Sequence, residues 1–346
     1  MNTTYNPETE ECSTSPFVHL PDDAPASCRK LANMYNMFIS KNIQGVLDNL
    51  DDQVNWLDQT GSPNAGGHIA GRYKGKEDVV DKHGNIITRG VRTFFSRLTG
   101  GYQYDLYCPY EFSQSDDGLT VTVSCHDSGT YAKDGRRFYT ESNHYWILNN
   151  KGLVVDFRAI NGETINGPND YVHRPINKIT QKTPDKGLSN VKKFYQLFSD
   201  RKYDDILEAN IFRKDVHFLN MGRVIVVDVQ GNYQGVSGLK KIFDQYNNCF
   251  VFNDITLDRL VYSNDRNIIT AVGRDNGWFV REKYDFTTEW NHVFYLDEDS
   301  QIYKCRIISA ESVPSVQYND LPVEAAQGRD VVSWDCESRS DRRSSC

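Results

Sequence analysis

An internal duplication constrains this chain more than any other feature of its sequence. A helical pattern of aromatic and aliphatic residues, MYNMF at 34–38, returns as FYQLF at 194–198, 160 positions later. The pentapeptide GRYKG at 71–75 returns as GNYQG at 231–235, also 160 positions later, and each is followed by the pattern of an amphipathic helix. Two separate matches at one offset predict two copies of one folded unit.

A third match has a different offset, and one insertion accounts for the difference. ESNHYWIL at 141–148 pairs with EWNHVFYL at 289–296, 148 positions later. Between the pentapeptide and the following helix, the first copy is 12 residues longer, in a stretch that contains VDKHGN at 80–85. The length of 346 residues agrees with a duplication, since domains of roughly 150 residues predict about two of them.

Each copy shows the same order of patterns: a helix, a strand, the glycine-flanked turn, a second helix and a run of long strands. Turn residues such as Asp116, Asp117 and Gly118 separate these strands. Helices followed by an antiparallel meander indicate the α+β class rather than alternating βαβ units. The long strands are expected at 102–112, 119–128, 136–148 and 153–160, and at 252–261, 267–274, 280–296 and 302–308.

The duplication also predicts where the domains begin and end. The first domain is expected at 29–160 and the second at 188–310. The segment 161–187 holds three prolines and is interpreted as a linker. The polar ends, 1–28 and 311–346, have the composition of disordered tails.

Composition and charge exclude several classes of function. With 47 acidic against 39 basic residues and a net charge of −8, the chain lacks the clustered cations that nucleic acid requires. No run approaches ~18 consecutive apolar residues, and the polar start is unlike a secretory leader. We therefore expect a cytoplasmic protein without a membrane segment. The chain has no metal-ligand spacing and no glycine-rich cofactor fingerprint, so neither a metal nor a cofactor is expected.

At this level the chain resembles the SnoaL-like and ketosteroid-isomerase-like branch of the NTF2-like superfamily. The resemblance is carried by VNWLDQTGS at 54–62, GRYKG at 71–75 and NHYWILNNKGLVVDFRAI at 143–160, and it covers nearly all of 29–310. It implies two cone-shaped domains in tandem, each a curved, mostly antiparallel sheet wrapped on N-terminal helices around an apolar cavity. Members of the superfamily include isomerases, polyketide cyclases, dehydratases, epoxide hydrolases and non-catalytic binding proteins, and the catalytic ones named here need no cofactor.

The resemblance implies candidate catalytic residues in the first copy. Asp58 matches the base carboxylate at the end of the first strand, and Tyr35 matches a helix-borne donor to a developing oxyanion. The family's second donor, a carboxylic acid, falls at Asn143, where an amide departs from the pattern. His126 is a further acid-base candidate, because dehydratases of the superfamily use a pocket histidine. The alternatives are an aspartate that only forms a turn and a tyrosine that only fills the core.

Strand alternation then assigns faces. If Asn143 faces the cavity, Glu141 and Tyr145 share that face, whereas His144 and Trp146 point outward. Aromatic residues on an outer face are normally covered, so we expect the two sheets to pack together as an internal pseudo-dimer. The residues expected between the sheets are His144, Trp146, His292 and Phe294.

The second copy differs from the first at the position of the candidate catalytic base. Asn220 stands where the first copy has Asp58, and an amide cannot take a proton at neutral pH. The first copy is therefore the expected catalytic or binding copy, and the second a structural partner or a non-catalytic pocket. The remaining residues expected to contact a small apolar or aromatic ligand are Trp56, Tyr73, Tyr195 and Asn291.

Two functions remain open at this point. One is a cofactor-independent isomerase, cyclase or dehydratase, with Asp58 as base and Tyr35 and Asn143 as donors to the substrate oxygen. The other is a non-catalytic binding or scaffolding protein built from two such domains, which the loss of family acids at Asn143 and Asn220 favours.

Overall fold

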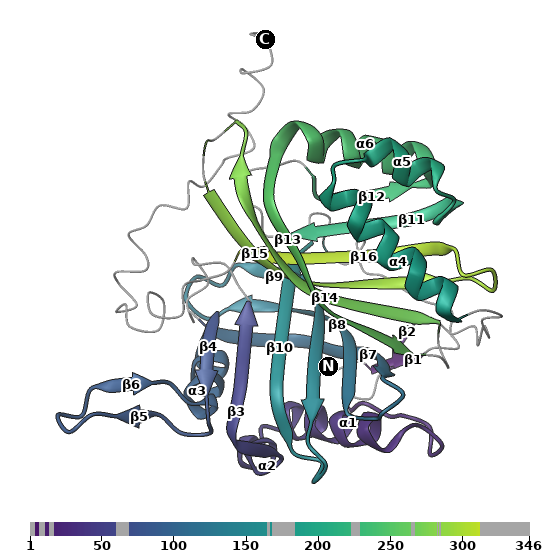
Figure 1. Ribbon diagram of the computed structural model, residues 1–346. Coiled ribbons are helices and arrows are strands. Elements are labelled where there is room, and N and C mark those ends of the chain that lie inside the picture. The colour runs from purple at the N-terminus through teal and green to yellow at the C-terminus, as the bar shows by residue number, and fades with distance from the viewer. Residues whose placement is uncertain are drawn as a thin grey trace.

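The computed structural model describes residues 4–6, 11–13, 17–59, 69–164, 167, 184–222, 229–263, 267–281, 283 and 285–311. These residues form two six-stranded sheets, one from each copy, with helices on one face of each sheet (Figure 1). No helix among them is long and apolar enough to cross a membrane.

Domain 1 is a curved sheet of strand order β4-β3-β10-β9-β8-β7, in which only the β3–β10 pair is parallel. Its elements are α1 (Ala26–Ile39), α2 (Ile43–Asp48), β3 (Leu50–Gln59), β4 (Gly71–Lys74), α3 (Val91–Gly101), β7 (Tyr102–Gln114), β8 (Thr120–Tyr131), β9 (Arg137–Leu148) and β10 (Val154–Glu163).

Domain 2 repeats this order as β12-β11-β16-β15-β14-β13, again with one parallel pair, β11–β16. Its elements are α4 (Pro184–Ser199), α5 (Tyr203–Glu208), β11 (Phe212–Gly222), β12 (Gly231–Gln234), α6 (Gly235–Cys249), β13 (Phe250–Ser263), β14 (Ile268–Phe279), β15 (Asp285–Leu296) and β16 (Ile302–Glu311). The identical strand orders confirm the predicted duplication and the α+β class, and two cones in tandem are what the resemblance to the NTF2-like superfamily implies.

The glycine-flanked pentapeptides recur because their backbone demands glycine. Gly71 and Gly75 have φ of 153° and 72°, and Gly231 and Gly235 have φ of 154° and 65°, a region that side chains with a Cβ rarely adopt. The tyrosine between each pair of glycines is buried. The Tyr73 hydroxyl donates to the carbonyl of Ile69 at 2.7 Å, and Tyr233 donates to that of Val229 at 3.0 Å.

Some predicted boundaries were wrong. The strands expected at 267–274 and 280–296 place their connection at 275–279, but β14 continues to Phe279 and the turn between β14 and β15 follows it. Gly277 lies inside β14. A glycine is required there because a Cβ would lie 2.0 Å from the carbonyl oxygen of Val251. The expected N-terminal tail contains a two-stranded sheet, β1 (Thr4–Asn6) with β2 (Glu11–Ser13), and α1 starts at Ala26.

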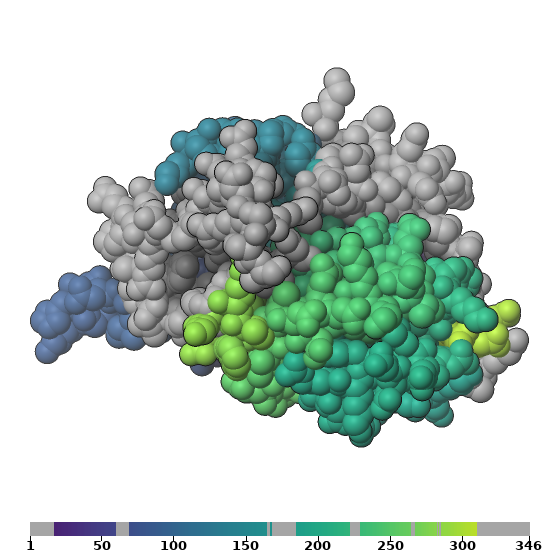
Figure 2. Space-filling model, turned by 90° about the horizontal axis from the view of Figure 1, so that it is seen from above, coloured from purple at the N-terminus to yellow at the C-terminus, as the bar shows by residue number. Residues whose placement is uncertain are grey.

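The insertion of the first copy is a β-hairpin, β5 (Val79–Val80) with β6 (Ile86–Thr88). It extends away from domain 1, and Figure 2 shows it in blue, projecting at the edge of the molecule. Its apolar side chains are unusually accessible, with Ile87 67% and Val80 54% exposed. Domain 2 passes directly from β12 to α6 at this point and has no such hairpin.

The outer faces of the two sheets pack against each other, and the strands of domain 2 run across those of domain 1 (Figure 1). At the centre of this interface, Nδ2 of Asn143 donates to the backbone oxygen of Asn291 at 2.8 Å. Nδ2 of Asn291 donates to the backbone oxygen of Asn143 at 2.9 Å. This reciprocal pair indicates a pseudo-twofold relation between the domains, because each residue makes the same bond with its counterpart.

Candidate active site

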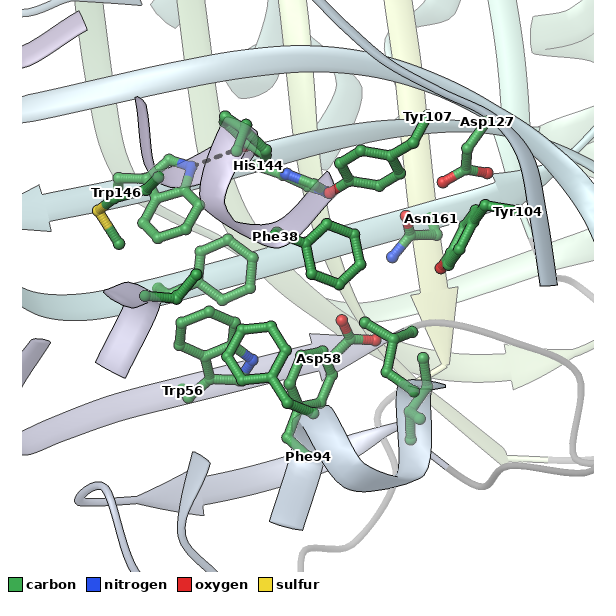
Figure 3. A pocket seen from close by; sticks show the side chains of 17 residues that line it. Phe38, Trp56, Asp58, Phe94, Tyr104, Tyr107, Asp127, His144, Trp146 and Asn161 are labelled. Carbon is green, nitrogen blue, oxygen red and sulfur yellow. Dashed lines mark hydrogen bonds between the residues drawn. The ribbon is translucent and has the colours of Figure 1, made fainter. Parts of the chain in front are cut away.

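The concave face of domain 1 and its helices enclose a cavity of about 60 Å³. Aromatic rings form most of its wall, including Phe38 from α1, Trp56 from β3, Phe94 from α3 and Trp146 from β9. In Figure 3 the two tryptophans and Phe94 occupy one side of the cavity. The periodic aromatic residues of α1 and α3 therefore build an apolar pocket against the sheet.

The opposite side of the cavity is polar. Asp58, Tyr104, Asp127 and Asn161 gather there, from strands β3, β7, β8 and β10 (Figure 3). The two carboxylic side chains are almost fully buried, since Asp58 is 4% and Asp127 7% exposed. The cavity thus brings two carboxyl groups into one apolar site.

Burial changes the ionisation of Asp127. Its pKa rises from 3.8 to about 8, chiefly because burial disfavours the charged form. The charges of Glu141 and Asp58 raise the pKa further, and His126 partly opposes them. At neutral pH Asp127 is therefore mainly a neutral carboxylic acid that can donate a hydrogen bond.

Tyr35 lies in the same cavity as Asp58, and two neighbours hold its hydroxyl. The indole Nε1 of Trp146 donates to the Tyr35 oxygen at 3.1 Å, and Nδ1 of His144 lies 2.6 Å from it. Burial lowers the pKa of His144 to about 3, so its imidazole is neutral. If the imidazole proton is on Nδ1, Tyr35 accepts twice and keeps its own hydrogen for a ligand. With the proton on Nε2, the hydroxyl donates to His144 instead.

The predicted faces of β9 were inverted. His144 and Trp146 point into the cavity, whereas Glu141, Asn143 and Tyr145 lie on the outer face between the two sheets. Asn143 was placed inside by its match to the family's second donor, but its amide is hydrogen-bonded to domain 2. Trp146 would have given the correct assignment of faces, because its large aromatic ring packs against the buried Tyr35 in the core of domain 1.

His126 was also expected in the cavity, and the structure contradicts this. Its Nδ1 lies 3.5 Å from Oε1 of Glu141, and its ring stacks on Tyr110, on the outer face of the sheet. The next residue, Asp127, faces the cavity. Strand alternation puts it on the face opposite His126, and it was not among the expected site residues. The signal was the pairing register, in which Asp127 stands opposite Thr140, on the same face as His144.

Domain 2 encloses a second cavity of about 60 Å³ that holds Tyr195 and Asn220. The Asn220 position is equivalent to Asp58, since each pairs with the first glycine of its pentapeptide. Its amide is used within the domain: Nδ2 donates to the carbonyl of Val229 at 2.9 Å, and Oδ1 accepts from the Tyr246 hydroxyl at 3.1 Å. Here too a buried acid, Asp275, has its pKa raised, to about 7, by burial.

The other expected ligand-binding residues separate into two groups. Trp56 lines the domain 1 cavity. Tyr73 is fixed by its bond to Ile69, and its ring packs on Phe94 from outside the cavity lining. Asn291, expected in the second cavity, lies instead in the interface between the sheets. In the part of the chain that the structure describes, no group of three His, Cys, Asp or Glu side chains is arranged to hold a metal ion.

No family model matches the chain. No curated protein matches it either. Among solved structures, it is similar to an NTF2-like protein from Burkholderia xenovorans, with 12% identity, a TM-score of 0.30, and coverage of 42% of this chain and 98% of that one. It is similar to an NTF2-like protein from Burkholderia thailandensis at 21% identity and a TM-score of 0.29, over 39% of this chain and 89% of that one. It is also similar to the epoxide hydrolase/cyclase-like enzyme SalBIII, at 13% identity and a TM-score of 0.30, over 42% of this chain and 95% of that one.

Proposed function

We propose that the chain is a cofactor-independent enzyme that moves a proton on a small apolar or aromatic carbonyl compound in the domain 1 cavity. The observation that carries this proposal is the pair of buried carboxyl groups, Asp58 and Asp127, in one aromatic-lined cavity. The charge of Asp58 is one of the causes that raise the pKa of Asp127, and two neighbouring carboxyl groups do not ionise together readily, so one is a base while the other keeps its proton. The reaction class is isomerisation, cyclisation or dehydration.

The roles follow from the surroundings of each group. Asp127, whose pKa is raised to about 8, is the protonated partner and donates to the substrate oxygen. Asp58 is the base and takes the proton from the carbon next to the carbonyl group. As negative charge moves onto the oxygen, the hydrogen bond from Asp127 strengthens, because few other polar groups compete for it in the apolar cavity. Asp127 thus supplies the donor that the family pattern had placed at Asn143.

The size of the cavity limits the substrate. A volume of about 60 Å³ is far below the ~300–1,000 Å³ of pockets for drug-sized ligands. The substrate is therefore a small ring or chain, or it enters only when aromatic side chains such as Phe38 move. The same small volume, together with the internally bonded amide of Asn220, supports the alternative of a non-catalytic binding or scaffolding protein, and for domain 2 we favour that alternative.

A solvent-exchange experiment tests the enzyme. The protein is incubated in D₂O with cyclohex-2-en-1-one and related small ketones, and deuterium entering at the carbon next to the carbonyl is followed by NMR. We expect exchange that Asp58→Asn slows by about 10²-fold or more, because the amide cannot accept the proton. Asp275→Asn, the same type of substitution in the domain 2 cavity, leaves it unchanged. Exchange that is equally fast in Asp58→Asn would leave only the binding alternative.

A further inference from the structure

A large groove lies between the two domains, on one side of the interface and outside both cones. Its volume is about 700 Å³, within the ~300–1,000 Å³ range of small-molecule sites. One wall is formed by β3, β4 and the β5–β6 hairpin of domain 1, and the other by β13, β14 and β15 of domain 2. Strands β9 and β10 contribute the residues between them.

The groove has a positive charge although the chain carries a net charge of −8. Among the described residues that line it, six are arginine or lysine and three are aspartate or glutamate. The cations are Arg72, Lys74, Arg89, Arg158, Arg259 and Arg274. The acids are Asp156, Asp258 and Glu289. Such an excess inside a concave surface raises the local concentration of anions.

The acids do not neutralise the cations. One carboxylate, Glu289, is shared by two arginines: Arg72, which contacts it directly, and Arg158 at 3.4 Å. Arg274 lies 3.5 Å from Asp258, but its side chain is 60% exposed. An exposed ion pair contributes little and is easily exchanged for another anion. Arg259 has a neutral partner here, since its Nη1 donates to the Tyr145 hydroxyl at 3.0 Å.

The pseudo-twofold relation shows that packing of the two sheets does not require an arginine at the positions of Arg259 and Arg274. On the other side of the interface, the counterpart of Arg158 and Glu289 is the pair Arg306 and Glu141, which are in contact and fully buried. That side is closed. The strand registers place Glu111 and His126 there, where the groove has Arg259 and Arg274. The two halves therefore diverged toward positive charge on the open side only.

The hairpin gives the groove an apolar wall. Ile86 and Ile87 line it while remaining 38% and 67% exposed. Because domain 2 lacks the hairpin, this wall also exists on one side only. Cations opposite exposed isoleucines suit a ligand with an anionic group at one end and an apolar body at the other.

From these contacts we propose that the groove binds a small organic dianion, such as a phosphate monoester of an apolar alcohol. Arginine recognises phosphate and carboxylate oxygens through paired hydrogen bonds, so Arg72, Arg259 and Arg274 hold the anionic group and Ile87 packs on the apolar part. This site is separate from the cone cavity, and it does not depend on the reaction proposed there.

Calorimetric titration with 1-naphthyl phosphate tests the proposal, with inorganic phosphate, 1-naphthoate and 1-naphthol as comparison ligands. We expect naphthyl phosphate to bind most tightly and its affinity to fall as salt is added. Arg274→Glu should weaken it about tenfold, because the exposed charge next to the dianion is reversed. Ile87→Ser should weaken naphthyl phosphate but leave inorganic phosphate unaffected. Tighter binding of naphthoate, a monoanion, than of naphthyl phosphate would contradict the assignment of the ligand as a dianion.

The control is Lys240→Glu on α6, where the lysine is 58% exposed and lies 3.2 Å from Asp244, much as Arg274 lies from Asp258. It changes the net charge by the same amount away from the groove. Equal losses of affinity in Arg274→Glu and Lys240→Glu would mean that only overall charge attracts the ligand, and would overturn the proposal. So would the failure of the wild-type protein to bind any of the three anions at millimolar concentration.

Discussion

The ionisation state of Asp127 can be tested through the pH dependence of unfolding. Asp127→Asn preserves the shape of the side chain but removes its titration. The pKa of Asp127 is about 8 in the folded protein against an ordinary 3.8. Between these values the folded state holds a proton that the unfolded state has released. The free energy of unfolding therefore falls as pH rises from about 4 to about 8 and is level above that range.

The magnitude follows from the size of the shift. A rise from 3.8 to about 8 is about four pKa units, and each unit corresponds to about 1.36 kcal/mol. The titration of Asp127 thus lowers the free energy of unfolding by at most about 6 kcal/mol between pH 4 and pH 8, or about 1.4 kcal/mol per pH unit. Asparagine carries no such cost. The advantage of Asp127→Asn over the wild type should grow with pH by that amount.

Urea unfolding followed by tryptophan fluorescence at several values between pH 5 and pH 9 measures this difference. Subtracting the two proteins at each pH removes the titration of all other groups, provided that both unfold in one transition. Asp275→Asn is a second test, because the pKa of Asp275 is about 7 and its advantage should stop growing one pH unit earlier. A difference between wild type and Asp127→Asn that is constant from pH 5 to pH 8 would refute the neutral acid and, with it, the donor role.

Two further predictions use the duplication as an internal control. Glu141→Gln should cost about 3–5 kcal/mol in urea unfolding, because it removes the carboxylate in contact with the fully buried Arg306. Glu289→Gln should cost less, since Arg72 is 53% exposed and the more buried Arg158 also donates to the carbonyl of Gly273. Equal losses would contradict this. Tyr35→Phe and Tyr195→Phe should each cost about 1–3 kcal/mol, because each leaves a buried histidine nitrogen without its hydroxyl partner. Only Tyr35→Phe should slow deuterium exchange, and a matching loss in Tyr195→Phe would move the activity to domain 2.

Much of the fold was predictable because its signals are local. The glycines of GRYKG and GNYQG report a backbone conformation that few other residues adopt, so they mark the same place in both copies. The insertion of 12 residues was found by comparing offsets, and it is the β5–β6 hairpin. Strand ends were less predictable. Gly277 resembles a turn residue in the sequence, but it is required by a close backbone approach within β14.

The site was predictable only in part, because a strand pattern gives alternation but not its absolute direction. Tyr35 and Asp58 do line one cavity. For β9, matching Asn143 to a family position fixed the wrong face. For β8, the resemblance to dehydratases with a pocket histidine favoured His126, which lies on the outer face. A buried strand packed on both faces shows polar residues such as Glu141 and Asp127 on either side, so hydrophobicity cannot decide between them. The partner that satisfies Glu141 is Arg306, 165 residues away, which no local pattern reveals.

A contact between the two domains affects the electrostatics of the domain 1 cavity. Glu141 stands on the outer face of the sheet, directly opposite His126 in the register, while Asp127 faces the cavity behind it. Its charge is one of the causes that raise the pKa of Asp127. Arg306 of domain 2 contacts this carboxylate and is itself fully buried. An arginine held there supplies the opposite charge to a carboxylate that would otherwise be buried without a contacting cation. Domain 2 therefore contributes to the electrostatics of the domain 1 cavity through the sheet, even though its own cavity has Asn220 at the position of Asp58.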